Sequence, residues 1–157
     1  MIYGKNASGK TNILRALDFL RDFILHKSAN KDNPTGVSPF ALDKALDSEF
    51  EIKYFHNDEV FLYKLKLNQD FICHESMHFW PQGRQALVFS RDLLETKDKN
   101  QYHYRFKWTG AEAPVALSEQ LELTVQNQSI LTALKGYNYS GPIQQGYEWF
   151  RDVLALS

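Results

Sequence analysis

Three short segments between Phe50 and Phe79 alternate between apolar residues and other residues. The segments FEIKYF, VFLYKLKL and FICHESMHF each carry this alternation, and the links HNDE and NQD between them have the length and composition of hairpin turns. Alternation with a period of two is typical of strands that bury one face. The sequence therefore predicts an antiparallel meander with one buried face.

The same alternation predicts which side chains form the core. One face collects Phe50, Ile52, Tyr54, Phe61, Tyr63, Leu65, Leu67, Phe71, Cys73, Met77 and Phe79, and Lys64 and Lys66 lie opposite. Two more strands are expected in QALVFS and YHYRFKW, separated by the polar connection RDLLETKDKNQ. In the second of these strands Tyr102, Tyr104, Phe106 and Trp108 alternate with His103, Arg105 and Lys107.

Helical spacing appears at both ends of the chain. Ile13, Leu14, Leu17, Leu20 and Ile24 predict a helix from about Gly9 to His26. Residues 28–39, SANKDNPTGVSP, are rich in turn formers and predict a loop, and FALDKALD could form a short helix. Within a helical segment at about 115–155 the candidates are ALSEQLELTV, NQSILTALKGY and PIQQGYEWFRDVLAL, the last with Pro142 in its first turn.

Composition limits the class of protein. A chain of 157 residues with 43% hydrophobic and 24% charged residues suits one globular domain. The net charge of −1 gives no general electrostatic case for binding nucleic acid. Cys73 is the single cysteine, which favours a reducing compartment. No apolar run approaches the roughly 18 residues that a membrane span needs, so we expect a cytoplasmic protein without a membrane partner.

The strongest chemical signal lies before the meander. The stretch GKNASGKT fits G-x-x-x-x-G-K-[ST], the spacing of a phosphate-binding P-loop. Its two glycines allow the backbone N–H groups to approach phosphate oxygens, and a helix that follows adds its N-terminal dipole. The candidate nucleotide-binding residues are Gly4, Lys5, Asn6, Ala7, Ser8, Gly9, Lys10, Thr11 and Asn12.

Two side chains of this motif have specific roles. Lys10 would reach the β- and γ-phosphates of a nucleotide, and the hydroxyl of Thr11 would bind Mg²⁺. The motif therefore predicts a nucleoside triphosphate and Mg²⁺ as ligands, and it does not distinguish ATP from GTP. A glycine-rich turn that only caps a helix is the alternative reading.

The stretch YGKNASGKTNILRAL resembles the P-loop of ABC-type ATPases of the RecF/SMC branch, which favour G-x-N-x-[SA]-G-K-[ST]-N, and Asn6 and Asn12 fit that pattern. The whole chain resembles bacterial AAA-family ATP-binding proteins of the abortive-infection, phage-defence type. The resemblance implies an α/β (α+β-like) fold: a P-loop NTPase lobe with the P-loop and helix at 1–27, a meander at about 50–108 and C-terminal helices. It also implies an ATPase whose composite sites form when two heads dimerise.

The chain also departs from that family. Only Met1, Ile2 and Tyr3 precede the motif, where two strands are expected, and no aliphatic run ends in Asp-Glu. LVFSRD is the nearest candidate for the Walker B acid, but Ser90 and Arg91 interrupt it. We therefore expect residues 1–157 to be a single N-terminal lobe of a longer ATPase. On its own, this lobe is expected to bind ATP weakly and not to hydrolyse it. No catalytic residue is identified.

Other patterns have less specific readings. ALSEQ at 116–120 resembles the ABC signature but lacks its glycines, and we expect a helix start with Ser118 as N-cap. His74 and His78 in CHESMH are expected to be surface residues rather than metal ligands, and no Ser/His/Asp or Cys/His constellation can be argued. The stripe of His103, Arg105 and Lys107 could touch DNA phosphates, although a solvated strand face explains it as well.

Two other functional classes remain open. The chain could be a non-catalytic interaction module with a vestigial P-loop, or a small-molecule kinase whose acceptor site is not recognisable in the sequence.

Overall fold

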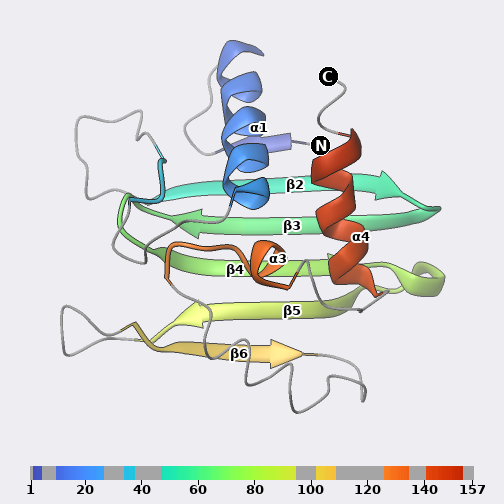
Figure 1. Ribbon diagram of the computed structural model, residues 1–157. Coiled ribbons are helices and arrows are strands. Elements are labelled where there is room, and N and C mark those ends of the chain that lie inside the picture. Colours follow the sequence, from blue (N-terminus) through green and yellow to red (C-terminus); the bar gives the residue numbers. More distant parts are fainter. Residues whose placement is uncertain are drawn as a thin grey trace.

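The computed structural model describes residues 2–4, 10–26, 34–37, 47–94, 102–108, 126–134 and 141–153. Within them, six strands form one antiparallel sheet in which neighbours in the chain are neighbours in space (Figure 1). The strands are β1 (Ile2–Gly4), β2 (Ser48–His56), β3 (Glu59–Leu67), β4 (Ile72–Phe79), β5 (Ala86–Leu93) and β6 (Tyr104–Trp108). The predicted antiparallel meander in a mixed α/β protein is confirmed.

Local turn chemistry sets the order of the strands. Asn57 and Asp58 join β2 to β3 with φ angles of 51° and 62°, as a two-residue hairpin turn with both central residues left-handed requires. In the next link the side-chain oxygen of Asn68 accepts hydrogen bonds from the backbone N–H groups of Asp70 and Phe71, at 2.9 and 3.0 Å. Both predicted hairpin links are therefore present.

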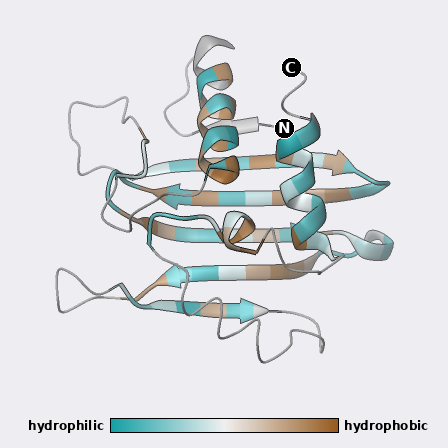
Figure 2. Ribbon diagram, in the orientation of Figure 1, coloured by the Kyte–Doolittle hydropathy of each residue, from teal (hydrophilic) through white to brown (hydrophobic). Residues whose placement is uncertain are grey.

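The alternation separates the two faces of the sheet as expected. Ile52, Tyr54, Phe61, Tyr63, Leu65 and Leu67 are buried, whereas the side chains of Lys64 and Lys66 are 43% and 41% exposed. Figure 2 shows the resulting change between hydrophilic and hydrophobic residues along β2 and β3. The predicted core face of these two strands is confirmed.

The prediction that Cys73 lies on the core face with Met77 and Phe79 is wrong. A shift of register between Lys66 and Leu67 pairs Leu67 with Ile72, so Ile72 is fully buried in the place expected for its neighbour. Cys73 is half-buried instead, and its thiol donates to Oδ1 of Asp47 at 3.4 Å. One irregular position thus changes the phase of the strand, which alternation alone does not reveal.

The prediction that the strand ends at Ser90 and that a polar connection begins at Arg91 is also wrong. β5 continues through Arg91 and Asp92 to Leu93, and each of these residues pairs with a residue of β6. The strand tolerates these polar residues because each has a partner: Arg91 lies in a buried cluster and Asp92 binds His74.

The helices cover one face of the sheet (Figure 1). They are α1 (Lys10–Leu25), α3 (Ile130–Ala133) and α4 (Pro142–Glu148), which continues as the π-helical turn η2 (Trp149–Val153); a short 3₁₀ turn, η1 (Pro81–Gly83), links β4 to β5. Aromatic contacts join this layer to the sheet, because Tyr54 stacks on Trp149 at 4.1 Å between ring centroids and Tyr63 meets Phe150 edge-on at 5.6 Å. The predicted first helix and the position of Pro142 are confirmed, and α3 is shorter than expected.

Several sequence predictions lie outside the described residues. They include most of the loop at 28–39, the short helix in FALDKALD, and the helix at 116–125 with its cap Ser118. The assignment of all 157 residues to one lobe stays a prediction. None of the helices in the described part of the chain is long and apolar enough to cross a membrane.

Candidate functional site

The P-loop motif lies between a strand and a helix. β1 ends at Gly4 and α1 begins at Lys10, and the residues between them, Lys5 to Gly9, lie outside the described part. Lys10, Thr11 and Asn12 form the first turn of α1. A strand, a connection of this length and a helix are the context in which the motif holds phosphate.

Both arms of this connection are anchored on the same residue of β2. Gly4 pairs with Phe50 in the antiparallel ladder between β1 and β2. The ring of Phe50 stacks on Phe19 of α1, with ring centroids 5.3 Å apart. The strand that enters the motif and the helix that leaves it are therefore fixed relative to each other.

The rest of α1 is held by the core. Leu20, Phe23 and Ile24 are buried, and Thr132 of α3 donates a hydrogen bond of 2.5 Å to the carbonyl oxygen of Ile24. Carbonyl groups in the last turn of a helix have no partner within it, so this hydroxyl satisfies one of them. The far end of α1 is thus tied to the helical layer.

The electrostatics at the start of α1 favour an anion. The first turn contains Lys10 and no acidic residue. The N-terminus of a helix carries partial positive charge and unpaired N–H groups, which proteins usually neutralise with Asp or Glu. A lysine in their place suits an external anion such as the phosphates of a nucleotide.

A buried polar cluster lies under the helices, and sequence reasoning missed it. Oε2 of Glu75 accepts hydrogen bonds from the hydroxyls of Tyr63 and Ser129, both at 2.5 Å, and Oε1 accepts from the N–H of Ile130 at 3.0 Å. Arg91 lies 3.6 Å from the same carboxylate, and both charged side chains are fully buried. Glu75 is in phase with Met77, and Arg91 with Phe89, so the alternation could have placed both on the core face.

This cluster connects the sheet to the helical layer. Arg91 donates to the carbonyl of Gln128 at 2.9 Å, and its guanidinium lies 4.6 Å from the ring centroid of Tyr104. Ser129 also caps α3 by accepting from the N–H of Leu131. Burial and the neighbouring carboxylate of Glu75 raise the pKa of Tyr63 well above its ordinary value, so its hydroxyl stays protonated as a donor. The arrangement fixes residues 126–134, and a carboxylate so enclosed cannot reach a bound nucleotide.

The nearest Walker B candidate lies on the wrong face. LVFSRD forms most of β5, and its acid Asp92 makes a 2.6 Å contact with Nδ1 of His74. Asp92 alternates with the buried Arg91, so it points away from the face that α1 covers. It is not placed to act at the start of α1.

The structure brings together a Ser/His/Asp group that the sequence did not suggest. Nδ1 of His74 contacts Asp92 at 2.6 Å, and Nε2 contacts the hydroxyl of Ser76 at 3.0 Å. The order resembles a catalytic triad, but a nucleophile needs an accessible hydroxyl and N–H groups aimed at an oxyanion. Ser76 is only 2% exposed, and it lies in a strand paired on both sides. We assign these three residues to the polar face of the sheet, the face opposite the helices.

The remaining candidates are also on this surface or outside the described residues. His103, Arg105 and Lys107 are exposed, as the solvated strand face requires. His74 and His78 are half-buried, and no group of three potential metal ligands occurs among the residues that the structure describes. ALSEQ at 116–120 is not described.

Comparison with known proteins supports the P-loop. Residues 1–75 match the family described as "AAA domain, putative AbiEii toxin, Type IV TA system". The matched segment contains β1, the motif, α1, β2, β3 and the first half of β4. No curated protein and no solved structure matches the chain significantly. The family match supports a P-loop ATPase of the AAA type, for which nucleotide binding is expected.

Proposed function

We propose that this chain binds Mg-ATP through a Walker A P-loop formed by Gly4 to Asn12, as part of an ABC-type ATPase of the RecF/SMC kind. One observation carries the proposal. The motif joins β1 to α1, and the first turn of α1 holds Lys10 without any acid. The family match over residues 1–75 adds independent support for an ATP-binding domain.

Different groups of the motif would bind different parts of Mg-ATP. Backbone N–H groups from Gly4 to Gly9 and at the start of α1 would hold the phosphate oxygens. The ammonium of Lys10 would bind the β- and γ-phosphates as a point charge, and the hydroxyl of Thr11 would bind Mg²⁺. The metal held by Thr11 would supply positive charge that neutralises part of the negative charge of the triphosphate.

Hydrolysis needs residues beyond those that bind. An ATPase must orient a water and hold the metal with a second acid. Of the two acids considered in the described strands, Glu75 is enclosed by Arg91, Tyr63 and Ser129, and Asp92 lies on the opposite face. Neither of these two acids is placed to serve the P-loop, so we assign the roles to other groups, which include those of a partner head. A phage-defence role follows only from the likeness to abortive-infection proteins.

Calorimetric titration of ATP with Mg²⁺ tests the proposal. Lys10→Ala should remove most of the affinity, whereas Arg15→Ala should leave it unchanged, because Arg15 is an exposed cation of the same helix outside the motif. Nucleotide at a hundredfold excess over Kd should also stabilise the wild-type protein by about 2.7 kcal/mol. Wild-type affinity in Lys10→Ala would remove the P-loop assignment. No stabilisation by ATP would favour a non-catalytic interaction module.

A further inference from the structure

The face of the sheet opposite the helices carries an ordered row of charges. The cross-strand partners run without a break from Glu49 to Lys66, His74, Asp92 and Arg105, one residue from each strand from β2 to β6. We call this row the charge ladder. A second row, two residues along each strand, contains Glu51, Lys64, Ser76, Ser90 and Lys107.

The charge ladder is antisymmetric about β4. From β2 to β6 the charges run acid, base, His74, acid, base. Positions at equal distances from β4 therefore carry opposite charges: Glu49 corresponds to Arg105, and Lys66 to Asp92. A second copy turned by 180° about an axis along β4 would therefore place Glu49 opposite the partner's Arg105, and Lys66 opposite the partner's Asp92. In the second row Glu51 would meet the partner's Lys107. A two-fold interface requires this kind of self-complementarity.

We propose that this open face of the sheet is a docking surface for a second copy of the same chain, with the two-fold axis close to β4. Two sheets that pack face to face keep their strands within about 30° of each other, which such an axis satisfies. In the described part of the chain α1, α3 and α4 all lie on the other face (Figure 1). The proposal does not depend on nucleotide binding.

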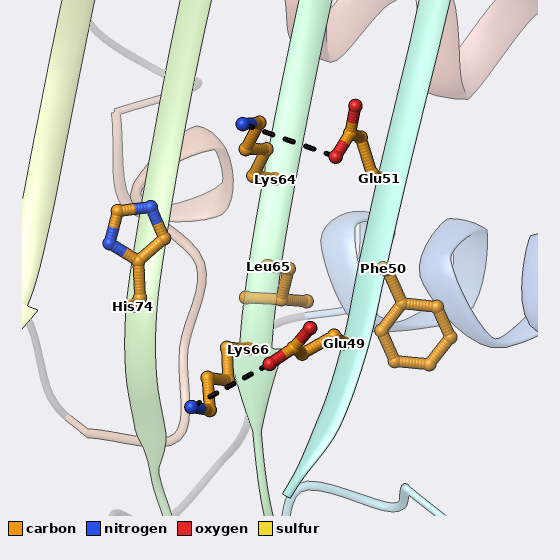
Figure 3. Close-up of a pocket in the computed structure, with 7 residues that line it drawn as sticks. All are labelled: Glu49, Phe50, Glu51, Lys64, Leu65, Lys66 and His74. Carbon is orange, nitrogen blue, oxygen red and sulfur yellow. Dashed lines mark ion pairs between the residues drawn. The ribbon is translucent and has the colours of Figure 1, made fainter. Parts of the chain in front are cut away.

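A groove over β2, β3 and β4 is the expected position of the partner's cations. It has a volume of about 220 Å³ and is lined by Glu49, Phe50, Glu51, Lys64, Leu65, Lys66 and His74. Figure 3 shows the two glutamates and the two lysines on the side of the strands away from the helices. In the dimer this groove receives the partner's Arg105 and Lys107, which add cations beside the two glutamates.

The contact would be weak and sensitive to salt. Two rows about 7 Å apart, across five strands about 4.8 Å apart, present on the order of 300 Å² per copy, which is below the roughly 800 Å² of a standard interface. Lys66 lies 3.6 Å from Glu49 and Lys64 lies 3.9 Å from Glu51. The four charges of β2 and β3 are therefore already paired within their own sheet, and association does not bury any of them without a partner. Charged contacts at a surface are screened by salt, so added salt should weaken the dimer.

Charge reversal with mixing tests the proposal by sedimentation velocity. The wild-type chain should form dimers at low salt and lose them at high salt. Lys66→Glu and Asp92→Lys should each be monomeric, because each variant's dimer contains two like-charge contacts between positions 66 and 92. An equimolar mixture should form a heterodimer, because both contacts then join opposite charges. We expect each reversal to weaken association at least about tenfold.

A matched reversal on the helix side controls for general charge effects. Asp18→Lys changes an exposed residue of α1 and should leave the dimer intact. If the circular dichroism spectrum shows that Lys66→Glu or Asp92→Lys is unfolded, the experiment uses Glu49→Lys and Arg105→Glu instead. The same two-fold axis places positions 49 and 105 opposite each other. A monomeric wild type at low salt, folded variants that fail to associate when mixed, or loss of the dimer in Asp18→Lys would each overturn the proposal.

Discussion

At the scale of single residues, the buried pair of Glu75 and Arg91 should contribute more to the free energy of unfolding than an exposed ion pair does. Arg91→Met would leave the carboxylate of Glu75 without its cation inside the core, and breaking such a pair typically costs about 3–5 kcal/mol. Lys64→Met removes a cation from an exposed pair with Glu51 and should cost less than about 1 kcal/mol. Urea unfolding of both variants measures the difference. Similar small losses in both would show that the buried pair contributes no more than a surface pair.

The thiol of Cys73 should be unreactive in the folded protein. Burial raises its pKa to about 12, and the nearby carboxylate of Asp47 adds to the effect. At pH 8 the reactive thiolate is then on the order of one molecule in 10⁴. A thiol-reactive chromogenic disulfide should modify the native chain slowly and the urea-unfolded chain rapidly. Asp47→Asn should accelerate the native reaction because it removes the negative charge; an unchanged rate would contradict this account.

At the scale of elements, the contact of α4 with the sheet depends on Gly146. A methyl group at this position would lie 2.5 Å from Cε and 3.2 Å from Sδ of Met77, which is fully buried in β4. Gly146→Val should therefore destabilise the fold by about 1–3 kcal/mol through overpacking. Combined with Met77→Ala, which opens space at the contact, it should cost less than the sum of the two single changes. Strict additivity in urea unfolding would show that the helix moves aside instead.

The elements that the sequence predicted are those defined by local signals. Alternation and the turn at Asn57 and Asp58 identify the hairpin of β2 and β3, and the spacing of Leu17, Leu20 and Ile24 identifies α1. The errors come from contacts between distant segments. Neither the bulge that brings Ile72 into the core nor the cluster that joins β4, β5 and residues 126–134 can be read from one strand alone.

The candidate site was predictable for a similar reason. A P-loop is a contiguous motif, so Gly4 to Thr11 can be recognised without the fold. The contacts of Gly4 and Phe19 with Phe50 of β2 join residues that are 46 and 31 positions apart in the sequence, and only the structure shows them. The order of the charge ladder likewise depends on the register of five strands.

At the scale of the whole molecule, the sheet separates the two proposed functions. The helix that follows the P-loop, α1, lies on the helical face of the sheet, and the charge ladder lies on the opposite face. The two activities should therefore be independent. Lys66→Glu should bind ATP with the affinity of the wild type, and Lys10→Ala should form the same salt-sensitive dimer.

This independence also distinguishes the dimer of the open face from the dimer of ATPase heads implied by the family resemblance. A head dimer holds nucleotide between its two copies, so it should require ATP and Mg²⁺ and be lost in Lys10→Ala. A dimer through the charge ladder should form without nucleotide, because none of its contacts involves α1 or the residues before it. Sedimentation of the wild type and of Lys10→Ala, each with and without ATP, separates the two. Association that appears only with ATP, and only in the wild type, would assign self-association to the helical face and leave the open face as a solvated surface.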